Sequence, residues 1–214
     1  LDKLNLVAAW QPLINERFQM SLETRVSIAE AEQLVKEAFL RNGVTEAVAM
    51  SVSTALVAAE AEGQVGHGFS RVKDYIAQVK SKKINVDAKV KIEHPKPTSI
   101  SIDADYGFAY PALDQAISEG ALVAKEYGSA VVSIFNSHHC GALSIQVEKI
   151  ANRGLIGLMM ANTPKAIAPW GGKEPFFGTN PIAFAVPRKE KDPLVIDLSL
   201  SKVARGKIMH AKKV

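Results

Sequence analysis

Residues 130–152 read AVVSIFNSHHCGALSIQVEKIAN, and this stretch decides the fold. Its opening run, 130–135, is short and apolar, whereas 142–152 repeats its apolar residues at helical spacing. A second apolar run follows at 155–160. Two buried strands joined by a helix are typical of parallel pairing. We therefore predict an α/β protein in which these two strands lie parallel.

Helices are expected at the start of the chain. Ser27 and Glu30 form a capping box ahead of a helical apolar pattern. Thr45 is predicted to cap a second helix that runs to about Glu62, and a third is predicted over 69–80. These segments predict a helical region that precedes the strands.

Strands and further helices are expected downstream. Alternation of apolar and polar residues predicts strands at 86–92 and 99–103. An amphipathic helix over 112–127 should stop at Gly128. Residues 164–178 have the composition of a loop, and short strands are expected near 182–186 and 194–198. Residues 201–213 resemble the opening of a helix without a packing partner, which suggests a piece of a longer protein.

Composition limits the class of protein. The chain has 214 residues, 47% of them hydrophobic and 22% charged, which excludes disordered, collagenous and coiled-coil proteins. A net charge of +4 disfavours nucleic acid as the main partner. The single Cys140 excludes an intramolecular disulfide. No membrane span or secretory signal is recognised, so a cytoplasmic protein that contacts no membrane is predicted.

A first candidate site lies at 66–75, GHGFSRVKDY. On a helix, His67 and Arg71 would face the same side, with Tyr75 one turn further. A titratable ring beside a guanidinium suits a small anionic substrate, because the guanidinium grips a carboxylate and the histidine moves a proton. The alternative is a surface helix with a capping histidine and a salt-bridging arginine.

A second candidate site is SHHCGA at 137–142, between a strand and a helix. Open α/β sheets bind ligands at this edge, where a helix start offers free N–H groups to an anion. A plain helix-cap loop is the alternative. A metal is not predicted, because adjacent side chains diverge and no ligand pair has zinc spacing. The strand-end loops 178–181 and 197–201 are weaker candidates.

Several familiar fingerprints are absent from the sequence. It has no G-x-G-x-x-G stretch, no Walker loop and no G-x-S-x-G elbow. A standard dinucleotide fold and a serine hydrolase are therefore not predicted.

Five ordered motifs resemble those of one family. They are GHGxxRxxxY (66–75), SHHCGA (137–142), APWGG (168–172), GTNPIAFAVP (178–187) and DLSxSxxARGK (197–207). Together they are similar to the type-2 malate/L-lactate dehydrogenase family. That family also includes ureidoglycolate and sulfolactate dehydrogenases, diketogulonate reductase and Δ1-piperideine-2-carboxylate/Δ1-pyrroline-2-carboxylate reductase. The likeness runs from about residue 27 to the end.

The resemblance implies a non-Rossmann α/β fold with N-terminal helices and a mixed sheet covered by helices. It also implies a homodimer that uses NADPH or NADH, with NADPH favoured. Residues 20–128 would form the helical, substrate-side region and 129–214 the cofactor-binding region, while 1–19 are an extension. The predicted reaction is reduction of a 2-oxo or cyclic 2-imino carboxylate, with the imine reductase branch favoured. A malate/L-lactate dehydrogenase or an inactive ligand-binding member is the alternative.

The resemblance also implies residue roles. His67 would be the proton donor, with His139 the second candidate, and Arg71 and Thr179 would hold the substrate carboxylate. Gly66 stands where members usually carry serine. The remaining substrate contacts would be Tyr75, Leu200 and Ser201, and the cofactor would be lined by His139, Cys140, Gly141, Ala142, Leu143, Thr163, Asp197, Leu198 and Ser199.

Overall fold

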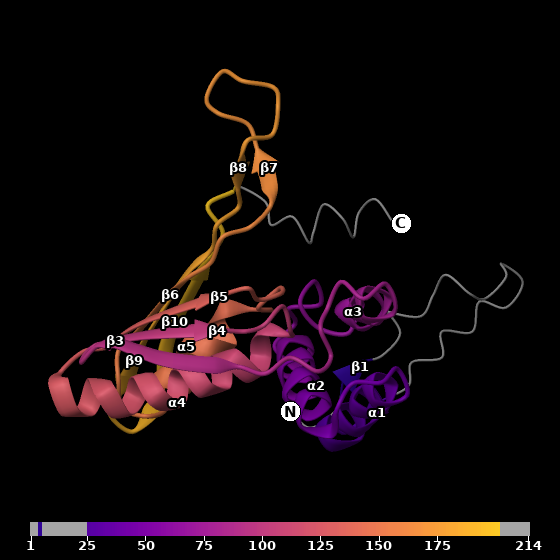
Figure 1. The fold of residues 1–214 in the computed structure, drawn as a ribbon, viewed down its shortest axis with the longest axis horizontal. Helices are drawn as coiled ribbons and strands as arrows, with labels where there is room; N and C mark the ends of the chain where they lie inside the picture. Colours follow the sequence, from indigo (N-terminus) through magenta and orange to yellow (C-terminus); the bar gives the residue numbers. More distant parts are fainter. Residues whose placement is uncertain (1–3, 6–24, 202–214) are drawn as a thin grey trace, which may run out of the picture.

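The computed structural model describes residues 4–5 and 25–201, and its N-terminal part is helical. It contains α1 (Ile28–Leu40), α2 (Glu46–Ala61) and α3 (Ser70–Lys80) (Figure 1). The predicted capping box is confirmed, because the Ser27 side chain accepts from Glu30 N and the Glu30 carboxylate accepts from Ser27 N. Thr45 occupies the N-cap of α2, but its side chain makes no capping hydrogen bond.

A mixed sheet follows the helices. It consists of β3 (Lys91–Lys96), β4 (Ser99–Asp103) and β5 (Val131–Phe135) in the order β3-β4-β5. The first pair is antiparallel and the second is parallel. Helix α4 (Ala109–Tyr127) connects β4 to β5 and packs on both. It ends at Gly128, as predicted, where φ is 87° in the left-handed region that glycine tolerates.

A second sheet has the order β10-β9-β6 and is antiparallel throughout. Its strands are β6 (Gly157–Met160), β9 (Ile182–Arg188) and β10 (Lys191–Leu198). Helix α5 (Leu143–Ala151) packs on all three and also contacts α4. A buried cluster that includes Leu143, Val147 and Ala183 fills the interface between α5 and the sheet.

The predicted parallel pairing of 130–135 with 155–160 is wrong. The parallel partner of β5 is β4, whereas β6 pairs antiparallel with β9 in the other sheet. The sequence correctly indicated a strand, a helix and a strand, but α5 carries the chain from one sheet to the next. Apolar patterns identify buried strands without specifying which strand lies beside them.

The predicted strand at 86–92 is also wrong, because the strand begins only at Lys91. The segment before Lys91 is held by side-chain hydrogen bonds and not by backbone hydrogen bonds to a neighbouring strand. The Asn85 side chain accepts from Asp87 N and donates to the Asp105 carbonyl, and the Asp105 carboxylate accepts from Lys89 N. Asparagine and aspartate offer the backbone such alternatives to sheet pairing.

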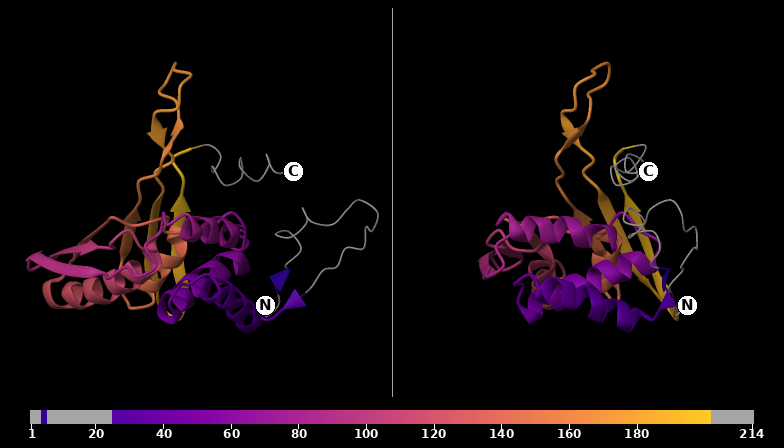
Figure 2. Two further views of the ribbon diagram at one scale, coloured as in Figure 1. Left: turned by 45° about the vertical axis from the view of Figure 1, so that its right-hand side comes forward. Right: turned by 90° about the vertical axis from the view of Figure 1, so that its right-hand side faces the viewer.

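Residues 161–181 form an arm that projects from the body (Figure 2). Sequence analysis treated 164–178 as a loop, but it contains the short antiparallel pair β7 (Lys165–Ile167) and β8 (Phe177–Gly178). Trp170, in the turn between these strands, is fully exposed.

Near the N-terminus, β1 (Leu4–Asn5) pairs with β2 (Arg25–Val26). The rest of the predicted extension and the helix predicted over 201–213 lie outside the described residues, apart from Ser201. Among the described helices, none combines the length and apolar character required to cross a membrane.

Candidate active site

Two histidines from distant parts of the chain lie against each other. The rings of His67 and His139 are stacked, with centroids 5.6 Å apart and planes at 9°. His139 follows β5, and His67 lies between α2 and α3. The fold therefore brings together the two candidate sites that the sequence placed about 70 residues apart.

The spacing predicted that His67 and Arg71 lie on one helix, and this prediction is wrong. Helix α3 begins at Ser70, so His67 lies in the turn before it, and only Arg71 and Tyr75 are helical. The turn is held by the bond from His67 N to Gln64 O, 2.7 Å, and by that from Phe69 N to the Glu60 carboxylate, 2.8 Å. The fold nevertheless keeps His67 close enough to Arg71 for the guanidinium charge to lower the pKa of the imidazole.

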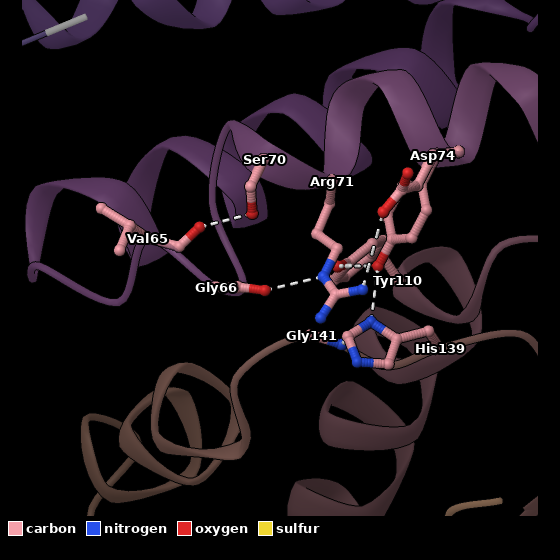
Figure 3. A network of polar contacts seen from close by, with 9 residues as sticks. Val65, Gly66, Ser70, Arg71, Asp74, Tyr110, His139 and Gly141 are labelled. Atoms are coloured by element: carbon pink, nitrogen blue, oxygen red, sulfur yellow. Dashed lines mark hydrogen bonds and ion pairs between the residues drawn. The ribbon is translucent and has the colours of Figure 1, made fainter. Parts of the chain in front are cut away.

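Tyr75 contacts His139 and joins it to a residue that sequence analysis missed. The Tyr75 hydroxyl is 2.7 Å from His139 Nδ1 and 3.1 Å from the Tyr110 hydroxyl (Figure 3). Both tyrosines are only 2% exposed. Tyr110 is 35 residues from Tyr75, so no local pattern in the sequence could have found this contact.

The histidines have unusual electrostatics. Burial lowers the pKa of His67, the Arg71 charge lowers it further, and the Asp197 carboxylate acts in the opposite direction. Burial, followed by the charges of Arg71 and His67, lowers the pKa of His139 to about 3. Although His139 keeps an exposed edge, its ring is neutral at pH 7. Arg71 and Asp197 therefore both act on the pKa of His67, in opposite directions.

Arg71 is fixed by its own turn. Its Nε donates to the Gly66 carbonyl at 2.7 Å, and its Nη1 lies 3.9 Å from the Asp74 carboxylate. Within the described part of the chain, Nη2 has no hydrogen-bond partner. A guanidinium anchored at Nε presents its remaining donors in a fixed direction, which suits recognition of a carboxylate.

The loop that carries His139 is shaped by Gly141. This glycine has a φ of +71°, and a Cβ there would lie 2.7 Å from the Tyr110 hydroxyl. The neighbouring His138 points elsewhere and has its Nε2 3.0 Å from the Lys83 carbonyl. The predicted divergence of the two histidines is confirmed. No group of three His, Cys, Asp or Glu side chains within residues 4–5 and 25–201 could hold a metal.

The start of α5 is already occupied by a carboxylate. Ser144 N donates to Asp197 Oδ2 at 2.8 Å, while the N-cap residue Ala142 provides no side-chain cap. Asp197 pairs with the buried Ala183, so both lie on the face of β10-β9-β6 that packs on α5. Of the backbone N–H groups that a helix start was expected to offer to a ligand, that of Ser144 is therefore already engaged.

Other predicted cofactor contacts are partly buried. The side chains of Ala142 and Leu143 belong to the core, so only their backbone could meet a ligand. Cys140 is half-buried, and burial raises the pKa of its thiol. Leu198 and Leu200 are exposed.

A second group of predicted residues gathers at the base of the arm. The hydroxyls of Thr163 and Thr179 are 3.1 Å apart, and Leu200 N donates to the Thr179 carbonyl. The hydroxyls of Ser199 and Ser201 lie 2.6 Å apart. Asn180, which sequence analysis did not select, accepts from Thr163 N. No hydrogen bond joins Thr179 to Arg71, both of which the structure describes, so their shared role stays a prediction.

The sequence model of the malate/L-lactate dehydrogenase family matches residues 26–214. The chain belongs to this family. The likeness stated on motif order alone is thereby confirmed.

Two curated relatives differ in the reaction that their names give. The chain is 46% identical over 188 residues to a (2R)-3-sulfolactate dehydrogenase (NADP(+)) of Chromohalobacter salexigens, covering 88% of this chain and 56% of that protein. It is 36% identical over 193 residues to a Δ1-pyrroline-2-carboxylate/Δ1-piperideine-2-carboxylate reductase of Pseudomonas putida, covering 90% and 57%. The chain thus spans a little over half the length of each.

Solved structures agree with the fold. The Δ1-piperideine-2-carboxylate reductase of Pseudomonas syringae superposes with a TM-score of 0.84 at 34% identity, covering 88% of this chain and 57% of that one. The malate dehydrogenase of Entamoeba histolytica gives 0.83 at 30% identity, with 88% and 52% covered. The predicted mixed α/β fold, with N-terminal helices, is confirmed.

Proposed function

We propose that the protein is an NADP-dependent oxidoreductase that interconverts a small 2-oxo carboxylate and its 2-hydroxy acid. The observation that carries this proposal is the His67–His139 stack beside the anchored Arg71 guanidinium. Such a cluster offers one group that moves a proton and one that holds a carboxylate.

His67 is the proposed proton donor in reduction. Because its pKa is lowered, its protonated form gives up a proton readily, and its neutral form accepts one in the oxidation of a hydroxy acid. The Asp197 carboxylate raises the pKa of His67 and so favours its protonated form. No carboxylate is among the causes of the pKa change of His139. His139 serves instead as a neutral hydrogen-bond donor beside the reacting group.

Arg71 is the proposed partner of the substrate carboxylate. With Nε engaged by Gly66, the guanidinium keeps donors for a ligand and places the carboxylate near both imidazoles. This contact would fix the reacting carbon next to the proton donor, which raises the rate through orientation.

The residues present fit the proposed cofactor. The hydroxyls at the base of the arm, Thr163, Thr179, Ser199 and Ser201, are neutral donors of the kind that bind amide and ribose groups. When bound, the nicotinamide supplies the hydride to the substrate carbon.

Two observations favour an oxo acid over a cyclic imine. The Arg71 charge that lowers the pKa of both histidines also disfavours a protonated imine nitrogen beside them. Identity is also higher to the sulfolactate dehydrogenase, 46%, than to the imine reductase, 36%. We therefore rank a 2-oxo acid with a second anionic group, such as a sulfonate, ahead of the imine favoured by the motifs.

The test is consumption of NADPH by the purified protein. Substrates would be 3-sulfopyruvate, oxaloacetate, pyruvate and Δ1-piperideine-2-carboxylate, each at several concentrations. We expect turnover of the oxo acids, with the highest kcat/KM for a dianionic one. Turnover of the imine alone would overturn the substrate class, and cofactor binding without any turnover would support an inactive ligand-binding member.

A further inference from the structure

We propose that Tyr110 is a positioning residue that acts through Tyr75 to hold His139 in one tautomer, with the proton on Nε2. The two tyrosines and the histidine form a continuous chain of hydrogen bonds, 3.1 and 2.7 Å long. This inference deepens the proposed function, because it concerns the second histidine of the same site.

The direction of the chain follows from Gly141. Its backbone N–H, which can only donate, lies 3.3 Å from His139 Nδ1. Nδ1 must therefore present a lone pair, and the Tyr75 hydroxyl donates to it as well. A neutral imidazole with an unprotonated Nδ1 carries its proton on Nε2.

Tyr110 sets the direction of the Tyr75 hydroxyl. Because Tyr75 gives its only proton to His139, its oxygen is the acceptor for the Tyr110 hydroxyl. Burial raises the pKa of Tyr75 to about 12 and that of Tyr110 well above its ordinary value, so both stay protonated. A buried hydroxyl at Tyr110 with no acceptor would be costly, which favours this single arrangement.

The fold keeps Tyr110 against the loop. Residue 141 has no Cβ, and one there would meet the Tyr110 hydroxyl at 2.7 Å. Helix α4 thus supplies the last hydroxyl of the chain, and α3 supplies the middle one. The outcome is a neutral ring whose buried edge is fixed and whose other nitrogen carries the donor proton.

The Tyr75 and Tyr110 hydroxyls lie beside His139, whereas the residue before His67 is Gly66 and has no side chain. This glycine offers no hydroxyl, and the Ser70 hydroxyl donates its proton to the Val65 carbonyl. The buried hydroxyls of the described site lie instead at the second histidine. The two tyrosine hydroxyls orient His139, the second of the two histidines.

The test is nitrogen NMR of the protein labelled with ¹⁵N-histidine. In the wild type, His139 should give one signal typical of an unprotonated Nδ1 and one typical of a protonated Nε2. In Tyr110→Phe, and more so in Tyr75→Phe, these two signals should move toward each other as tautomers mix. Tyr106→Phe is the control, because this tyrosine is exposed and is not part of the hydrogen-bonded series Tyr110, Tyr75 and His139.

Activity provides a second readout. Tyr110→Phe should lower kcat roughly tenfold, as loss of a supporting hydrogen bond commonly does, with KM little changed. Combined with Tyr75→Phe, it should have almost no further effect, since Tyr110 acts only through Tyr75. Additive losses in the double variant would overturn the proposal, as would unchanged His139 signals in both single variants.

The two readouts separate this inference from the proposed function. If the tautomer is as expected but no substrate is turned over, the proposed function fails and the positioning role of Tyr110 stands. If oxo acids are reduced but the His139 tautomer is unchanged in both tyrosine variants, the positioning role of Tyr110 is wrong and the proposed function stands.

Discussion

The site depends on single side chains whose chemistry is set by their neighbours. Burial and the charge of Arg71 lower the pKa of both His67 and His139, and the Asp197 carboxylate counteracts this only at His67. Two rings of the same kind, 5.6 Å apart, thereby receive different roles.

Replacing His67 by alanine tests the first role. We expect the chemical step to slow by ~10² to 10⁴, because the positioned acid is lost, with cofactor affinity nearly unchanged. Single-turnover kinetics and a cofactor titration would measure this. His139→Ala is the matched comparison, and full activity of H67A with a dead H139A would reverse the ranking of the two histidines.

Changing Arg71 to lysine tests the carboxylate contact. A lysine cannot donate from Nε to Gly66 and also present a fork, so KM for the substrate should rise by on the order of tenfold or more. The measurement is KM for one oxo acid at saturating NADPH. Lys73→Arg, on an exposed position of the same helix, is the control. An unchanged KM in R71K would remove the carboxylate role.

At the scale of an element, the N-terminus of α5 is capped by a side chain from strand β10. Asp197 in β10 accepts from Ser144 N, the task that an N-cap side chain performs in most helices. This contact joins the second sheet to the loop that carries His139, so the strand end and the helix start are fixed together.

Asp197→Ala should therefore cost about 1 kcal/mol of the free energy of unfolding, the usual value for loss of a helix cap. Urea denaturation followed by circular dichroism would measure it. Asp192→Ala is the control, because Asp192 lies on the same strand and its side chain makes no hydrogen bond or ion pair within the described part of the chain, so this variant should change little. Equal stability of the two variants would show that Asp197 does not stabilise α5.

At the scale of the whole molecule, the described fold leaves one sheet face open. Leu158, Met160, Leu194, Ile196 and Leu198 are exposed on β6 and β10, opposite the face that packs on α5. The core thus lies entirely on one side of this sheet.

Stability of the whole molecule should depend on His139. Its folded pKa is about 3, against an ordinary value near 6.5, so the unfolded chain binds more protons between these values. The contribution of His139 is therefore fully present above pH 6.5 and declines as the pH falls toward 3. Burial raises the pKa of Glu60, which acts in the opposite direction at the acid end.

The measurement is the free energy of unfolding at pH 7, 6 and 5 for the wild type and His139→Gln. The wild type should lose more stability on acidification than the variant, because only the wild type carries an imidazole whose pKa is lowered in the folded state. Parallel curves would contradict the lowered pKa. The homodimer and the cytoplasmic location expected from the sequence both stay predictions.

The sequence by itself determined features that depend on neighbours along the chain. The capping box at Ser27, the helix end at Gly128 and the strand–loop–helix unit around 130–152 follow from local hydrogen bonding and apolar periodicity. Motif order also indicated the family, since several short motifs in one order seldom coincide.

Only the tertiary structure decided which elements meet. It placed β5 beside β4 instead of β6, put His67 in the turn before the helix of Arg71, and brought the Tyr110 hydroxyl within hydrogen-bond distance of Tyr75. These outcomes depend on contacts between residues far apart in sequence, where packing and hydrogen-bond satisfaction of the whole fold select one arrangement among several with similar local preferences.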